Sequence, residues 1–222
     1  MATTSAADEQ PRVSKRQIRS TTEVRDLILT AARERFAAMG YAGTTTRQIA
    51  ARAGVMENRI FKHFGNKATL FEKAVVEPFR KATEEFLERW GTQRGLPHTA
   101  EFTAHEFIAS LYDLIENQAE LLIALMSARR LEAGTDESVE QPLIPLLHEL
   151  ERVGAYELGA NGYAGVDLQV VVRCMFSMVV FNAAFADALY VPGVRRPDRD
   201  RIVREMTSFF VHGVAHRPPE PS

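Results

Sequence analysis

The stretch TTRQIAARAGVMENRIFKHFGNKATLF, which spans residues 45–71, decides the fold. Thr45 and Gln48 have the spacing of a capping box, and the apolar residues that follow predict a short helix over residues 46–53. After a glycine break, a second short helix is expected over residues 57–64. Two short helices joined by a glycine-containing turn form a helix-turn-helix unit, whose second helix can enter the major groove of DNA.

The residues before this stretch predict a basic arm followed by one longer helix. Ser20 and Glu23 repeat the capping-box spacing, and apolar side chains then recur at helical intervals until Gly40. Residues 1–19 are rich in Ser, Thr, Ala and charged residues and show no apolar period, so they are expected to form a flexible arm. They also lack the apolar core of a signal peptide.

The residues after this stretch predict helices only. Asn66 can cap a long helix that starts at Lys67, and Pro78 inside that pattern is expected to kink it. No alternating apolar pattern indicates a strand. Further helices are expected near residues 101–117, 119–132, 139–152, 165–191 and 197–216, with loops at residues 91–97, 133–138, 155–164 and 192–196 and a disordered tail at residues 217–222.

These elements predict an all-α chain with two domains. Residues 20–66 are expected to form a three-helix DNA-binding domain with the helix-turn-helix, and residues 67–216 a helical bundle for ligand binding and dimerisation. The composition of the 222 residues, 45% hydrophobic and 25% charged, is that of an ordinary globular protein. A single cysteine excludes a disulfide within one chain, which fits the reducing cytoplasm.

The formal net charge of −2 hides a division along the chain. Residues 12–67 carry twelve Lys or Arg against four Asp or Glu, whereas residues 68–222 carry fifteen against twenty-three. A basic head on an acidic body favours a polyanionic partner for the head alone. A solvated surface is the plainer interpretation of any such charge cluster.

Three stretches resemble the DNA-binding signature of the TetR family of transcriptional regulators: residues 31–41 (AARERFAAMGY), 44–55 (TTTRQIAARAGV) and 60–71 (IFKHFGNKATLF). The resemblance covers about residues 20–71, and the rest of the chain matches only in length and helical pattern. It implies a ligand-responsive regulator that binds a near-palindromic operator as a homodimer and is released by a small apolar effector. Repression is the commoner mode in the family, and activation stays open.

The resemblance also implies which residues touch double-stranded DNA. Arg47 and Arg59 can each make two bonds to guanine, and Asn58 can make two to adenine. The sequence departs from the family pattern at Met56, where a Ser or Thr cap is usual, at Asn58, and at Phe61, which lacks a hydroxyl. The implied DNA-binding residues are Thr45, Thr46 and Arg47 on the supporting helix, Glu57, Asn58, Arg59, Phe61, Lys62 and His63 on the recognition helix, and Lys67 at the next helix start.

Plainer roles stay open for several of these residues. Lys62 and Lys67 could belong to an ordinary solvated surface, and His63 is expected to pack or to contact a phosphate rather than to bind a metal. The apolar residues Phe36, Ile49, Ile60 and Phe64 are expected to form the core of the head.

Two C-terminal helices predict a homodimer. The helix near residues 165–191 carries apolar residues on all sides, Val170 and Phe181 among them, and such a helix must be covered on every side. Cys174 lies in the same run and is expected to be an inert thiol in the core. The helix near residues 197–216 supplies a second apolar face, and together they predict a two-fold interface of four helices.

An effector cavity is expected between helices of the body. Ordinary core packing is the alternative for the side chains that could line it, so the sequence assigns no ligand-binding residue, and no cofactor is expected. The candidates are Phe86, Trp90, Phe102, Phe107, Leu111, Leu122, Met126, Met175 and Phe181.

An all-helical enzyme and a helical scaffold with an incidental basic face are the alternative functions. His212 and His216 have the spacing of a metal-binding pair, but no acidic third ligand stands near them. No phosphate-binding glycine loop and no nucleophile elbow occurs, so no catalytic residue and no metal site is predicted. The apolar run at residues 170–191 is interrupted by polar residues, which leaves too short a clean run to cross a bilayer and favours a buried helix.

Overall fold

The computed structural model describes residues 20–92, 99–131, 143–160 and 165–215. Every regular element in these ranges is a helix, which confirms the all-α prediction. The predicted N-terminal arm, the C-terminal tail and the loop at residues 133–138 lie outside the described residues.

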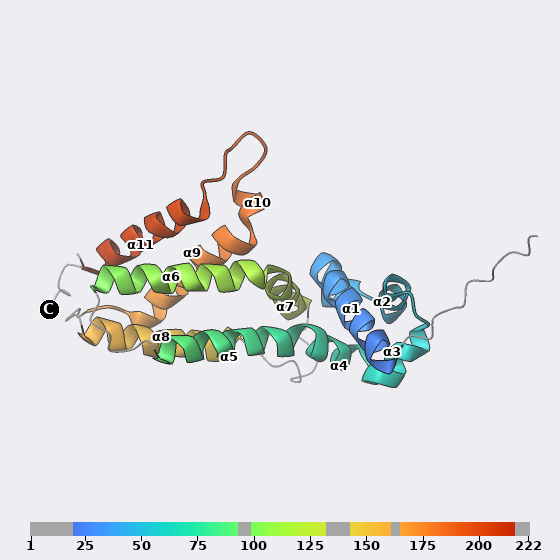
Figure 1. The fold of residues 1–222 in the computed structure, drawn as a ribbon. Coiled ribbons are helices and arrows are strands. Elements are labelled where there is room, and N and C mark those ends of the chain that lie inside the picture. The colour runs from blue at the N-terminus through green and yellow to red at the C-terminus, as the bar shows by residue number, and fades with distance from the viewer. Residues whose placement is uncertain (1–19, 93–98, 132–142, 161–164, 216–222) are drawn as a thin grey trace, which may run out of the picture.

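Three helices form the head at one end of the molecule (Figure 1): α1 (Thr21–Gly43), α2 (Thr46–Ala53) and α3 (Glu57–Phe64). Both predicted capping boxes are formed, since the hydroxyls of Ser20 and Thr45 accept from the backbone N–H three residues later at 3.1 and 3.2 Å. The bounds of α2 and α3 are those predicted. The expected core residues are buried between the helices: Phe36, Ile49, Ile60 and Phe64.

Gly40 interrupts α1 three residues before its end. Its φ of 69° and ψ of 174° lie in a region that glycine alone adopts without strain. The residue is buried against α7 (Ala119–Leu131), where an added Cβ would lie 3.2 Å from the Cβ of Ser127. The predicted stop at Gly40 is therefore a sharp change of direction, after which the helix resumes to Gly43.

Gly40→Ala is expected to lower the free energy of unfolding by about 1–3 kcal/mol, because alanine is strained in this backbone conformation. Gly43→Ala is the matched control: Gly43 has helical backbone, and a Cβ there would meet Met39 Cβ at an ordinary 3.5 Å. Urea unfolding should show unchanged or slightly higher stability for the control. An equal loss of stability in both variants would contradict the role given to Gly40.

The long helix predicted from Lys67 is present but divided. Asn66 caps α4 (Lys67–Phe71), as predicted, by accepting from the N–H of Thr69 at 2.7 Å. A single π-turn, η1 (Glu72–Val76), comes next, and α5 (Glu77–Thr92) then continues along the body. The helical elements after residue 66 form the body of the molecule. The chain thus runs without a loop from the head to the far end of this body.

The π-turn lies directly before Pro78, the residue predicted to kink this helix. Proline has no N–H, so it leaves the carbonyl of Ala74, four residues earlier, without its helical donor. That carbonyl accepts from Nε of Arg33 on α1 at 3.1 Å. The irregularity expected at Pro78 is therefore the π-turn that precedes it, and the Arg33 side chain of the head bonds to this turn.

The rest of the body is also helical, and α5, α6 and α8 run along its length (Figure 1). The predicted loop starting at residue 155 is wrong over its first six residues, because α8 extends to Ala160. Gly154 of this helix lies close to Leu168, because a Cβ at position 154 would come within 2.9 Å of Cδ1 of Leu168. The elements are α6 (Ala100–Asn117), α7 (Ala119–Leu131), α8 (Leu143–Ala160), α9 (Leu168–Ala184), α10 (Ala186–Leu189) and α11 (Arg199–Ala215).

The single helix predicted over residues 165–191 is wrong, because the chain breaks between α9 and α10 at Phe185. In a continuous helix the carbonyl of Asn182 would accept from the N–H four residues later. Here it accepts from the hydroxyl of Tyr112 at 3.2 Å and from Nη2 of Arg196 at 3.4 Å. Side chains from outside the helix thus replace the backbone N–H that would donate to the Asn182 carbonyl in a continuous helix.

Ion pairs attach the start of α11 to α6. Arg199 donates from Nε and Nη2 to the two carboxylate oxygens of Asp113, each at 2.6 Å, and this pairing raises the pKa of Arg199 above its ordinary value. Arg196 donates to the hydroxyl of the fully buried Tyr112 at 2.7 Å. These contacts fix α11 along the body and account for the predicted loop at residues 192–196, which is confirmed.

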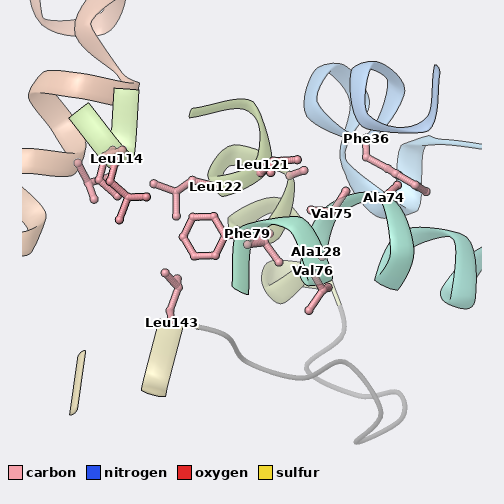
Figure 2. Close-up of a cluster of buried hydrophobic side chains, with 14 of the residues drawn as sticks. Phe36, Ala74, Val75, Val76, Phe79, Leu114, Leu121, Leu122, Ala128 and Leu143 are labelled. Atoms are coloured by element: carbon pink, nitrogen blue, oxygen red, sulfur yellow. The ribbon is translucent and has the colours of Figure 1, made fainter. Parts of the chain in front are cut away.

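Head and body share one hydrophobic core. Figure 2 shows Phe36 of α1 beside Ala74 and Val75 of η1, with Leu121 and Ala128 of α7 next to them. All five side chains are buried. A displacement of η1 or α7 would therefore also displace the side chains of α1 that pack against them, because closely packed cores transmit strain.

Candidate nucleic-acid interface

The exposed side of α2 and α3 carries three cationic side chains. Asn58, Arg59 and Lys62 are exposed, and Lys62 lies four residues after Asn58 and three after Arg59, which places it on the same side of α3 as both. Arg47 is exposed on the first turn of α2. Within the described part of the chain Arg47, Arg59 and Lys62 form no ion pair, so their charges are available to a polyanion.

Thr46 and Glu57, both predicted to touch DNA, bind each other. The Thr46 hydroxyl donates to Oε1 of Glu57 at 2.6 Å. This bond joins the first turn of α2 to the first turn of α3 and brings Arg47 close to the start of the recognition helix. Thr45 has a local role as well, since its hydroxyl caps α2.

Met56 stands at the N-cap of α3 and is exposed, with no side-chain hydrogen bond to the helix. The prediction that this residue cannot cap the helix is confirmed. Unsatisfied N–H groups at a helix start carry partial positive charge and attract phosphate. Phe61, on the same helix, is half exposed.

His63 and Lys67 lie at the edge of this surface. His63 is half-buried, its Nε2 is covered and has no hydrogen-bond partner, and its ring lies 6.1 Å from that of Phe64. Nζ of Lys67 lies 4.1 Å from the centre of the Tyr41 ring, a cation–π contact that positions the ammonium at the start of α4. The structure thus places His63 in a packed position and Lys67 in a fixed one.

Arg52, on the same helix as Arg47, differs in its surroundings. It donates from Nε to the carboxylate of Glu34 on α1 at 2.6 Å. This hydrogen bond lowers the pKa of Glu34 below its ordinary value. One arginine of α2 is therefore engaged within the head, and the other is exposed to a partner.

The two helices predicted to form the dimer interface expose apolar side chains. On α9, Val170 and Phe181 are about half exposed, and on α11 Phe209 is 73% exposed. The prediction that Cys174 is a core thiol is wrong: it is exposed on the same side of α9 as Val170. A single copy of the chain covers only part of a helix that is apolar on all sides.

The candidates for the effector cavity fall into three groups. Trp90, Phe107 and Met175 line a cavity in the body. Phe86, Leu111 and Leu122 are fully buried in the core, and Phe102, Met126 and Phe181 are exposed, so these six are not its walls. The sequence missed the walls contributed by α8 and α11, because it gave no indication of which helices adjoin.

In the part of the chain that the structure describes, no three side chains of His, Cys, Asp or Glu gather in a way that could hold a metal ion. Nδ1 of His212 lies 2.7 Å from the carbonyl of Ser208, and His216 falls outside the described residues. Among the described helices, none has the length and apolar character needed to cross a membrane.

The head is similar to a known protein family, and the chain as a whole is similar in fold to solved structures. Residues 28–74 match the model of "Bacterial regulatory proteins, tetR family". No curated protein matches the chain. The matched segment extends from the middle of α1 through the helix-turn-helix into η1.

Several solved structures share the fold at low sequence identity. The regulator FadR from Bacillus subtilis, solved with stearoyl-CoA, is 17% identical with a TM-score of 0.59, over 85% of this chain and 98% of that one. The fatty acid degradation regulator FadR from Bacillus halodurans is 19% identical (TM-score 0.59; 87% and 97% covered). A transcriptional regulator from Rhodococcus sp. Rha1 is 19% identical (TM-score 0.58; 87% and 99% covered).

The family model and the structures are consistent with each other. The model covers the helix-turn-helix with its exposed cationic residues, and the structural matches extend the same fold through α11. Residues 28–74 thus match the tetR-family model, and most of the chain shares its fold with solved structures of transcriptional regulators.

Proposed function

We propose that this protein is a ligand-responsive transcriptional repressor that acts in the cytoplasm, binds a near-palindromic operator as a homodimer, and leaves it when a small apolar effector binds. The observation that carries the proposal is the set of exposed cations on α2 and α3, Arg47, Arg59 and Lys62, in a head that matches the tetR family model. An enzyme or a passive scaffold would not need unpaired charges at this position.

The proposed DNA contacts differ in what they recognise. Arg47, Asn58 and Arg59 are proposed to contact base edges, because their side chains can make paired hydrogen bonds there. Lys62 and Lys67 are proposed to contact phosphate, which fixes position without selecting a sequence. Thr45, Thr46, Glu57, Phe61 and His63 complete the proposed surface, with Glu57 held away from phosphate by Thr46.

The proposed dimer forms through α9 and α11. Their exposed apolar residues, Val170, Phe181 and Phe209, would be covered by the same residues of a second copy. Such a dimer would place two recognition helices about one turn of DNA apart, roughly 34–36 Å.

The proposed response to effector uses the division between a DNA-binding domain at residues 20–66 and a regulatory domain at residues 67–216. The rod formed by α4, η1 and α5 connects them, and Arg33 holds the π-turn in that rod by its bond to Ala74. An effector that binds the DNA-free arrangement better would shift the population toward it. The Bacillus subtilis structure was solved with stearoyl-CoA, whose acyl chain is apolar, and this supports an effector that is apolar at least in part.

Selection of bound fragments from genomic DNA tests the proposal. Full-length protein is expected to retain fragments that share an inverted repeat, with two protected half-sites centred about 10 base pairs, or a multiple, apart. Uniform retention of all fragments, or retention of none, would contradict a sequence-specific regulator.

A further inference from the structure

The helices α5, α6, α8, α9 and α11 adjoin at the end of the body away from the head (Figure 1). Residues of all five helices line a cavity of about 100 Å³. The described residues of its wall are apolar except for Thr103 and Glu157, and Glu157 already has an interaction partner. The largest wall residues are Trp90, Phe107, Leu150, Met175 and Phe210.

The cavity does not result from loose packing of the helices around it. Gly154 forms part of its wall, and a Cβ there would lie 2.9 Å from Cδ1 of Leu168, another wall residue. Phe107 is packed edge-to-face against Trp90, with ring centres 4.9 Å apart. The walls are thus in close contact with one another while the space between them stays open.

The chemistry of the walls selects what can enter. Among the described residues that line the cavity there is no Lys, Arg or His, so a carboxylate or phosphate in contact with them would lose its hydration without gaining a partner. An apolar cavity of similar size, about 150 Å³, stays dry and binds benzene. The volume therefore suits one ring or a short alkyl group, on the order of six to eight carbon atoms.

We infer that this cavity is the effector site and that its ligand is a compact, neutral, apolar molecule of about one ring. This inference rests on the proposed function and narrows it. The ligand contacts Trp90 near the C-terminal end of α5, the helix that continues through η1 and α4 to the head. It also contacts α9 and α11, whose other sides carry the exposed apolar residues. A bound ligand therefore contacts the helix that leads to the head and both helices of the proposed dimer interface.

Toluene, with benzoate and benzylamine as charged analogues of the same shape, is the probe set. Trp90 is the only tryptophan of the chain, so its fluorescence reports on the cavity wall directly. Toluene is expected to change the Trp90 emission, to raise the Tm by roughly 5–10 °C at one hundred times its Kd, and to weaken operator binding at least fivefold. Benzoate and benzylamine are expected to do none of these.

Two variants with the same substitution give the control. Ala104→Leu places a larger side chain in the wall and should abolish the toluene effects while operator binding is kept. Ala155→Leu, at an exposed position of α8, should respond as the unmodified protein does.

Three outcomes would overturn the inference: no response to toluene in protein that binds its operator, a response to benzoate equal to that to toluene, or toluene binding with unchanged operator affinity. None of them removes DNA binding. Failure of the proposed function would be recognised separately, by the absence of operator binding before any probe is added.

Discussion

Phe181→Glu is expected to convert the dimer into monomers and to lower operator affinity by a factor of 10² to 10⁴. The side chain is half exposed on α9, in the face that we propose a second copy covers. In a dimer the glutamate would be buried without a partner on both sides of the two-fold axis, which costs several kcal/mol. A monomer would also lose the gain from binding two linked half-sites at once, which accounts for the factor of 10² to 10⁴.

Light scattering coupled to gel filtration, followed by operator titration, measures both effects. Ile144→Glu is the matched control, because Ile144 is a similarly exposed apolar residue that belongs to α8 and not to α9 or α11. The control should remain a dimer with normal affinity. A dimeric Phe181→Glu protein would show that the interface lies elsewhere.

Cys174 offers an independent check on the same face. It is exposed on α9 between Val170 and Phe181 and is the only cysteine of the chain. A thiol reagent should therefore modify the monomeric Phe181→Glu variant quickly and the unmodified dimer slowly.

Arg47→Ala is expected to weaken operator binding roughly 10- to 100-fold per half-site, equivalent to about 1–3 kcal/mol, while unspecific binding changes little. Arg47 is exposed at the start of α2, close to the start of the recognition helix, and within the described residues it has no ion-pair partner. The loss should be large because a guanidinium that bonds twice to guanine is replaced by a group that cannot bond at all. Competition titrations with operator and random duplex separate the two kinds of binding.

Arg52→Ala is the matched control, since it removes the same charge from the same helix. Arg52 is paired with Glu34 within the head, so its removal should change operator affinity less than threefold. Equal losses for Arg47→Ala and Arg52→Ala would mean that general charge, and not a specific contact, determines binding.

The sequence was sufficient to predict the head because its signals are local. Capping residues and glycines are adjacent to the turns they form, and the bounds of α2 and α3 followed from Thr45, Gly65 and the residues between them. The family resemblance implied that Arg59 and Lys62 face DNA, and both are exposed.

The errors lie in the body, where distant contacts override local patterns. The break at Phe185 depends on Tyr112 and Arg196, which lie far away in sequence and bind the carbonyl of Asn182. The burial predicted for Cys174 was wrong because a strongly apolar helix can leave one side to a partner. The Thr46–Glu57 bond was also missed, since a side-chain pair between two helices has no local signature.

The salt dependence of operator binding tests the central claim most directly: that α3 binds a groove of duplex DNA with cations of the head on the phosphates around it. Two cations per head, Lys62 and Lys67, are proposed to contact phosphate, which gives four per dimer. The logarithm of affinity should then fall with the logarithm of salt concentration with a slope of about −4. A slope near zero, or no measurable preference for any duplex at low salt, would contradict the account.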